Sequence, residues 1–142
     1  MRKKRILIVD DEPMILASLE QFLAGMDYEI ASYGEPDTCP IYSNNVECCP
    51  NDEPCSDIVI LDLKMPRMNG IQLFEKQKQR GCKIDTRNKT IISGYPPTNN
   101  HSDQVKELGC SYLEKPFIVS ELLKWVDECN KRIDTSQSLR SL

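Results

Sequence analysis

The sequence predicts a doubly wound α/β fold: a five-stranded parallel sheet in the order 2-1-3-4-5 with helices on both of its faces. Short runs rich in Ile, Leu and Val alternate along the chain with longer segments whose apolar residues recur at helical spacing. Helical crossovers between successive strands make the strands parallel and bury both faces of the sheet. The length of 142 residues suits one such domain, since a domain of this size buries roughly two-thirds of its unfolded surface.

The first strand is expected over residues 5–11, where the apolar run of RILIVDD ends in two acidic residues. Pro13 suits the first turn of the helix that follows, and Asp11 is its expected N-cap. Apolar residues recur at helical spacing as far as Ala24, and Gly25 then ends the helix.

The remaining elements continue the alternation. Strands are expected over residues 28–33, 57–62, 89–93 and 111–115; helices are expected over residues 70–80, around 102–108, and from near Ser120 to Ile133. Residues 134–142 are expected to be a polar tail or linker stub, so the domain itself is expected to cover residues 1–133.

One segment breaks this alternation. Residues 34–56 (GEPDTCPIYSNNVECCPNDEPCS) stand where a second crossover helix is due, but their prolines and asparagines are poor helix formers. We therefore expect an irregular, cysteine-rich insertion with at most one or two turns of helix.

Charge and hydropathy exclude several kinds of protein. The net charge of −4 argues against direct nucleic-acid binding through a basic face. The apolar run at residues 6–9 is too short for a signal-peptide core, and no apolar stretch reaches the length of a membrane span. We expect a cytoplasmic chain without a membrane partner.

Acidic residues gather where two neighbouring strands of the predicted sheet end. Asp10 and Asp11 end the first strand and Asp62 ends the third, and ligands of such sheets bind at this carboxyl edge, where the strand order reverses. Three carboxylates at close range resist ionisation unless a cation neutralises them. Hard oxygen ligands of this kind suit Mg²⁺, which also holds phosphate oxygens.

The same edge is expected to carry a hydroxyl and an ammonium group. Ser93 ends the fourth strand and Lys115 the fifth. Each residue alone has an ordinary structural interpretation, such as a helix cap or a solvated lysine, but together they are suited to phosphoryl transfer. They would place a carboxylate nucleophile opposite an incoming phosphoryl group whose charge Ser93, Lys115 and a metal ion stabilise.

Four motifs, ILIVDDEP, ILDLKMPRMNG, IISG and YLEKPF, occur in the order and at the spacing of one known family. On these motifs, over about residues 4–133, the chain resembles a response-regulator receiver domain of two-component signalling, in the CheY-like superfamily. The resemblance implies that Asp62 takes a phosphoryl group, as an aspartyl phosphate, from a sensor histidine kinase or a phosphotransfer protein. It also implies that Asp10, Asp11, Asp62 and the backbone carbonyl of Lys64 hold Mg²⁺.

The resemblance implies roles for further residues. Ser93 would contact the phosphoryl group and move towards it on activation, Lys115 would pair with the phosphoryl oxygens, and Pro116 would follow Lys115 through a cis bond. Tyr112 matches the aromatic position whose side chain swings inward in the active state. Phosphorylation would change which downstream protein is bound, so we expect a switch rather than an enzyme, one that catalyses only its own phosphorylation and dephosphorylation.

Two enzyme classes fit the sequence less well. A haloacid-dehalogenase-type phosphatase also uses an aspartate nucleophile at a strand end, but it needs a second acid two residues later, where this chain has Lys64. A nicotinamide-dependent oxidoreductase is disfavoured because no G-x-G-x-x-G motif follows the first strand.

The cysteines suggest a second site at the opposite edge of the sheet. Cys55 precedes the third strand and Cys82 follows the helix after it, so both are expected at the amino ends of the strands. A four-thiolate set for Zn²⁺ or an iron–sulfur cluster would comprise Cys39, one of Cys48 and Cys49, Cys55 and Cys82. Free thiols and a reversible disulfide remain alternatives.

These cysteines give a second functional hypothesis, in which the chain is a redox- or metal-sensing module on a receiver scaffold and phosphorylation is secondary. Cys110 and Cys129 are expected in the core instead, because Cys110 precedes a buried strand and Cys129 lies on the apolar face of the last helix.

Overall fold

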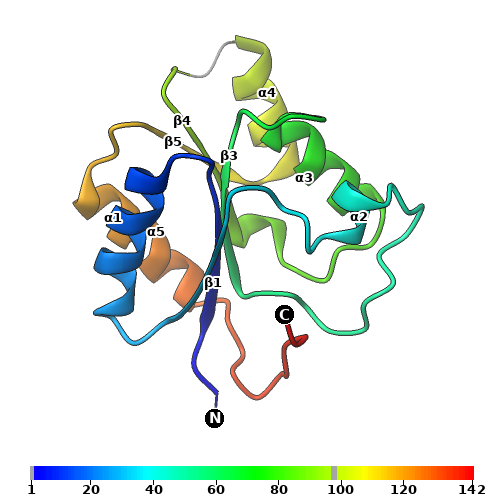
Figure 1. Ribbon diagram of the computed structural model, residues 1–142, viewed down its shortest axis with the longest axis horizontal. Helices are drawn as coiled ribbons and strands as arrows, with labels where there is room; N and C mark the ends of the chain where they lie inside the picture. Colours follow the sequence, from blue (N-terminus) through cyan, green and yellow to red (C-terminus); the bar gives the residue numbers. More distant parts are fainter. Residues whose placement is uncertain (1, 97–98) are drawn as a thin grey trace.

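The computed structural model describes residues 2–96 and 99–142, and it confirms the predicted fold class (Figure 1). Five parallel strands form one sheet in the order β2-β1-β3-β4-β5. Their bounds are β1 Arg5–Val9, β2 Glu29–Tyr33, β3 Ile58–Asp62, β4 Lys89–Ser93 and β5 Ser111–Glu114.

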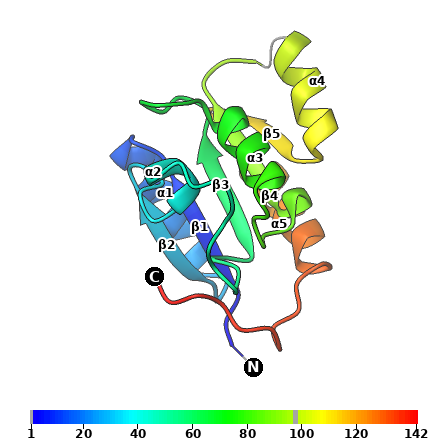
Figure 2. The same ribbon diagram turned by 90° about the vertical axis from the view of Figure 1, so that its right-hand side faces the viewer.

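Helices cover both faces of this sheet (Figures 1 and 2). Two of them, α1 (Pro13–Ala24) and α5 (Val119–Asn130), pack on one face. The other face carries α2 (Pro40–Ser43), α3 (Gly70–Gln79) and α4 (Asn99–Leu108), and a short 3₁₀ helix, Thr86–Asn88, precedes β4. Each helix layer therefore covers a separate cluster of buried side chains.

The central strands explain why the sequence alternates as it does. Every residue of β3 and of β4 is buried, as expected for strands that are covered on both faces. Ile58 and Ile60 join the α1 and α5 cluster, while Val59 and Leu61 join the α2, α3 and α4 cluster. The two-residue period of a strand thus divides one apolar run between two cores.

The start of α1 differs from the prediction. Glu12, not Asp11, is the N-cap residue, and its side chain makes no capping hydrogen bond. Pro13 is the first helical residue, and a residue before proline is driven to the extended conformation that Glu12 adopts, with φ −88° and ψ 109°. Asp11 is consequently left outside the helix.

The last helix is shorter than predicted, because it ends at Asn130 rather than near Ile133. The chain turns there, and the Arg132 amide donates to the Cys129 carbonyl oxygen at 2.9 Å. Ile133 still packs against the core of that face. The helical spacing of Ile133 correctly indicated that it packs against the core, but it overestimated the length of the helix.

The cysteine-rich segment contains one helical turn, α2, as its composition predicted. Residues 134–142 pack against this segment after crossing the amino ends of the strands (Figures 1 and 2). The Arg140 amide donates to the Pro54 carbonyl at 2.9 Å, and Arg5 donates to the Arg140 carbonyl at 2.7 Å. The expected polar tail is therefore attached to the domain by hydrogen bonds.

Within the described parts of the chain, every helix is too short or too polar to cross a lipid bilayer.

Candidate functional site

Three carboxylates meet at the carboxyl edge of the sheet. Asp10 directly follows β1 and Asp62 is the last residue of β3, and these two strands are neighbours. Asp10, Asp11 and Asp62 each offer an oxygen within 4.8 Å of the others, and they are the one such group of three potential metal ligands among the described residues. Asp10 and Asp62 are buried, whereas Asp11 is exposed.

Lys115 supplies the positive charge of this site. Its ammonium nitrogen lies 2.7 Å from Asp10 Oδ2 and 3.6 Å from Asp62 Oδ1. It also lies 3.0 Å from Glu12 Oε1. The lysine follows β5 and is joined to Pro116 by a cis peptide bond, as the family resemblance implied. Burial alone would lower the pKa of this ammonium group, but hydrogen bonds to the Asp10 and Glu12 carboxylates outweigh that effect and raise it.

Asp62 is difficult to ionise in this environment. Its pKa is raised from 3.8 to about 6, mainly by burial and then by the negative charge of Asp10. The Lys115 ammonium and the Lys64 amide, 3.4 Å from Asp62 Oδ1, act in the opposite direction. One ammonium group does not offset three carboxylates, so the site favours a further cation.

The residues present suit a magnesium ion. The family resemblance implied Mg²⁺ at an acidic cluster; here three carboxylates converge, and the buried Asp10 Oδ2 has no hydrogen bond beyond its ion pair with Lys115. Carboxylate oxygens around a surplus negative charge are the donor set that a small, hard divalent cation prefers.

The predicted hydroxyl and aromatic residues lie on the adjoining strands. Ser93 ends β4, the strand next to β3, and its hydroxyl oxygen accepts a hydrogen bond from the Tyr95 amide at 3.2 Å. Tyr112 on β5 donates its hydroxyl hydrogen to the Tyr95 carbonyl at 3.0 Å. The Lys64 ammonium lies 4.5 Å from the centre of the Tyr95 ring. Tyr95 thus connects Ser93, Tyr112 and Lys64.

Two contributors to the site were missed in the sequence. Glu12 forms an ion pair with Lys115. In the sequence, only its position directly after Asp10 and Asp11 could have suggested a role at this site. Gly70 begins α3 against the end of β3. A Cβ atom there would lie 2.8 Å from the Asp62 carbonyl oxygen and 2.7 Å from Ile91 Cδ1, closer than real Cβ contacts. The absence of a side chain at position 70 lets α3 approach the strand that presents Asp62.

Gly70→Ala should therefore disturb the site from outside it. We expect a loss of about 1–3 kcal/mol in the free energy of unfolding, the usual cost of overpacking, together with slower phosphorylation, because the Asp62 backbone must shift. Urea denaturation and an initial-rate assay measure both. Gly34→Ala is the control, because a Cβ atom there has nothing within 4 Å; equal losses in the two variants would contradict this explanation.

Four of the predicted cysteines line one apolar pocket between the cysteine-rich segment, the sheet and α3. Cys39, Cys49, Cys55 and Cys82 are half-buried around it, whereas Cys48 is exposed and is not part of its lining. All seven cysteines are free thiols. No three sulfur atoms of the described residues lie within 4.8 Å of one another, so the predicted four-thiolate set is not assembled. Burial raises the pKa of the Cys55 thiol, although Arg140 opposes this.

Cys110 and Cys129 are buried in the core, as predicted.

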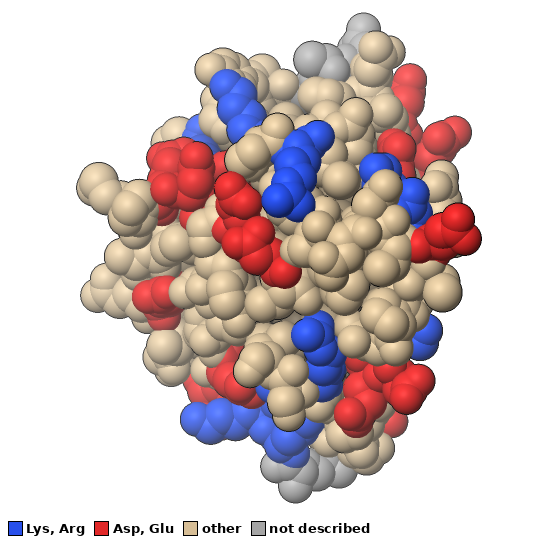
Figure 3. All heavy atoms as spheres, turned by 45° about the vertical axis from the view of Figure 1, so that its right-hand side comes forward, with Lys and Arg blue, Asp and Glu red and all other residues tan. Residues whose placement is uncertain are grey.

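On the molecular face drawn in Figure 3, acidic and basic side chains are interspersed. That the chain does not bind nucleic acid directly stays a prediction.

Comparison with known proteins identifies the family of this chain. Residues 6–127 match the family model of the response regulator receiver domain. The two-component response regulator ARR11 of Arabidopsis thaliana is 30% identical over 130 residues, which are 91% of this chain but 23% of that protein. The chain thus spans less than a quarter of the length of this curated relative.

Solved structures agree with the fold. A receiver domain protein (CheY-like) from Methanospirillum hungatei JF-1 has a TM-score of 0.66 and 28% sequence identity, with 93% of this chain and 100% of that one covered. The signal receiver domain of an HD domain-containing protein from Pseudomonas fluorescens Pf-5 has a TM-score of 0.71, with 93% and 90% of the chains covered; at 22% identity it supports the fold alone.

Proposed function

The chain belongs to the response regulator receiver domain family of two-component signalling, and we propose that Asp62 is its phosphoacceptor. Receiver domains interact with histidine kinases or phosphotransfer proteins, and they are signalling domains rather than catalysts. The observation that carries the proposal is the position of Asp62: it ends a fully buried strand, beside Asp10 and Asp11 and within reach of the Lys115 ammonium.

In the proposed reaction, a carboxylate oxygen of Asp62 attacks the phosphorus atom of a phosphohistidine on the partner. The bond between phosphorus and the imidazole nitrogen breaks, the imidazole leaves with that electron pair, and an aspartyl phosphate forms. Asp62 has to be ionised to attack, and its place at a rigid strand end fixes the attacking oxygen in position. Lys115 and the Ser93 hydroxyl would stabilise charge on the transferring oxygens.

Asp10, Asp11, Asp62 and the Lys64 carbonyl would hold the Mg²⁺ ion. When bound, this ion supplies positive charge that offsets the carboxylates and the phosphoryl oxygens. The test is incubation of the purified chain with a phosphorylated histidine donor, with and without Mg²⁺, followed by intact-mass analysis. The mass of one added HPO₃, formed only with Mg²⁺, supports the proposal; no added mass with any donor would refute it.

We further propose that Ser93 and Tyr112 transmit phosphorylation to the surface that contacts the downstream protein. Attraction of Ser93 towards the phosphoryl group would break its hydrogen bond with the Tyr95 amide. The Tyr95 carbonyl is also the acceptor for Tyr112, so movement of residues 93–95 would release the Tyr112 hydroxyl. This arrangement links the acceptor edge to β5 through one short loop.

Tyr112→Phe should loosen that loop before phosphorylation. The variant lacks the hydroxyl that holds the Tyr95 carbonyl, and we expect faster amide hydrogen exchange at Gly94 and Tyr95 with a stability loss of about 0.5–1.5 kcal/mol. Tyr33→Phe on β2 is the control, because no hydrogen bond of the Tyr33 hydroxyl is present among the described residues. Unchanged exchange at Gly94 and Tyr95 in Tyr112→Phe would contradict the proposed linkage.

A further inference from the structure

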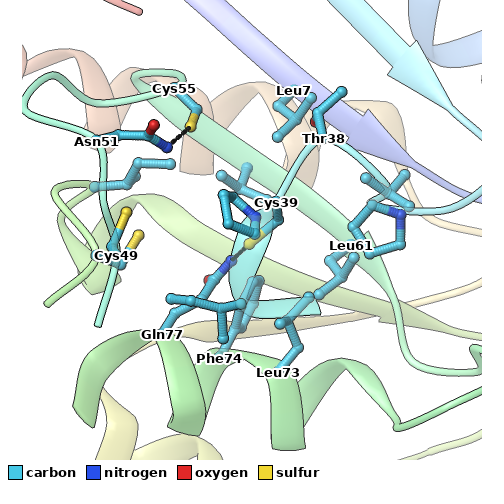
Figure 4. Close-up of a pocket in the computed structure, with 17 residues that line it drawn as sticks. Leu7, Thr38, Cys39, Cys49, Asn51, Cys55, Leu61, Leu73, Phe74 and Gln77 are labelled. Atoms are coloured by element: carbon cyan, nitrogen blue, oxygen red, sulfur yellow. Dashed lines mark hydrogen bonds between the residues drawn. The ribbon is translucent and has the colours of Figure 1, made fainter. Parts of the chain in front are cut away.

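The pocket lined by the four half-buried thiols lies between the cysteine-rich segment, the sheet and α3 (Figure 4). In Figure 4 the side chains of Cys39, Cys49 and Cys55 surround the same space, and Cys82 completes the lining from the chain after α3. The cavity is small, about 40 Å³, and its remaining walls are largely apolar, including Leu73 and Phe74.

Three of these sulfur atoms face nitrogen donors from separate parts of the chain. Gln77 Nε2 lies 3.4 Å from Cys39 Sγ, and Arg140 Nη1 lies 3.3 Å from Cys55 Sγ. Lys89 Nζ lies 3.4 Å from Cys82 Sγ. N–H groups directed at sulfur are typical of the residues that surround thiolate metal centres, where they orient the ligands and stabilise their negative charge.

Two of the donors are cations without acidic partners. Lys89 is fully buried; its ammonium donates to Gln77 Oε1 at 2.7 Å and lies 5.2 Å from the centre of the Phe74 ring. Arg140 donates to the Thr38 carbonyl as well as to Cys55. Among the described residues, neither cation has a carboxylate within 4.0 Å. Burying an uncompensated cation is costly, so an anionic complex beside Lys89 and Arg140 would be stabilised by both charges.

We propose that Cys39, Cys49, Cys55 and Cys82 bind one Zn²⁺ ion. Four thiols would release four protons and form a tetrathiolate complex of net charge −2, which the charges of Lys89 and Arg140 balance. Zinc accepts four thiolates in a tetrahedral arrangement. Because no three of these sulfurs lie within 4.8 Å of one another, binding has to draw them together by movement of the segment that carries Cys49 and Cys55. Residues 45–55 contain no helix or strand, and the Cys49 amide already holds this segment next to the end of α3 by donating to the Arg80 carbonyl at 2.7 Å.

The complex would stabilise the cysteine-rich segment, which has little regular structure of its own, because the binding energy of a structural zinc ion adds to folding stability. It would also anchor residues 134–142, because Arg140 carries this tail to Cys55. The inference does not depend on the phosphoacceptor proposal, because none of the acidic residues of the acceptor site, nor Lys115, lines the pocket.

The test is titration of the reduced, full-length chain with Co²⁺ and then Zn²⁺, monitored by visible absorption. We expect one equivalent of Co²⁺ to give the visible bands of tetrahedral thiolate coordination, and one equivalent of Zn²⁺ to displace it. Cys49→Ser should abolish these bands, whereas Cys48→Ser should retain them. The two cysteines are adjacent, but only Cys49 lines the pocket, so the pair is a matched control for any general effect of losing a thiol.

Substitution of the cations separates metal binding from folding. Lys89→Met and Arg140→Gln keep all four ligands and should each weaken Zn²⁺ binding by about 10-fold or more, with circular dichroism reporting that the fold is kept. Asp62→Asn should bind Zn²⁺ as the parent does, so failure of this inference and failure of the phosphoacceptor proposal are distinguishable.

Three results would overturn the inference. The first is the absence of stoichiometric Co²⁺ and Zn²⁺ binding. The second is equal loss of binding in Cys48→Ser and Cys49→Ser. The third is rapid disulfide formation between pocket thiols in place of metal binding, seen as a mass loss of two hydrogens; this would make the pocket a redox site.

Discussion

Asp62→Asn is expected to abolish phosphoryl transfer and, at the same time, to stabilise the protein. The asparagine amide is not a nucleophile for phosphorus, so the mass of an added HPO₃ should disappear. The parent protein holds the Asp62 carboxylate in a buried site beside Asp10, where its pKa is raised to about 6. Because the neutral amide removes that repulsion, we expect about 1–2 kcal/mol of added stability at pH 8 without Mg²⁺.

The pH dependence of this gain provides an internal control. A carboxyl group whose pKa is higher in the folded state lowers stability as pH rises, from its ordinary value of 3.8 up to the folded value of about 6. The advantage of Asp62→Asn should therefore be near zero below pH 4 and fully developed above pH 6. Urea denaturation at pH 4 and pH 8 measures it; equal effects at both pH values would contradict the electrostatic explanation.

Lys115→Met is expected to have the largest effect on stability. It leaves the fully buried Asp10 carboxylate without the ammonium that lies 2.7 Å away. Removing one partner of a buried ion pair costs about 3 kcal/mol or more, and we expect this loss at pH 8 without Mg²⁺. Phosphorylation by a small acyl phosphate should slow by about 10²–10³-fold, because the variant lacks one positive charge at the transferring oxygens.

Two controls apply to Lys115→Met. Added Mg²⁺ should restore part of the lost stability, since the ion offsets the same carboxylates, but it should not restore the full rate. Lys64→Met removes a nearby ammonium that lies over the Tyr95 ring rather than against a carboxylate, and it should change stability by less than about 1 kcal/mol. A loss of similar size in both variants would show that the pairing of Lys115 with Asp10 has no special role.

The acceptor site was largely predictable because its residues sit at strand ends. Asp10, Asp62, Ser93 and Lys115 each follow or end an apolar run, and the order of a doubly wound sheet brings these ends to one edge. The side-chain period of a strand and the crossover rule are properties of local sequence and chain topology. They suffice to place Asp62 beside Asp10 without any knowledge of side-chain packing.

The residues that sequence reasoning missed depend on contacts between distant segments. Arg140 reaches Thr38 and Cys55 only because the tail turns back after α5, and no pattern within residues 134–142 indicates that path. The burial of Lys89 likewise depends on Gln77 and Phe74 of α3. From sequence alone, a lysine at the start of a strand is expected to be solvated. Only the packing of α3 shows that this one is buried.

The most direct test of the phosphoacceptor assignment is the position of the modified carboxyl group. The chain is phosphorylated in the presence of Mg²⁺ and reduced with borohydride, which converts an aspartyl phosphate to homoserine, and the peptides are then sequenced by tandem mass spectrometry. We predict homoserine at position 62 and at no other position, with none in Asp62→Asn. Homoserine at position 10 or 11, or a phosphoryl group that persists in Asp62→Asn, would contradict the assignment.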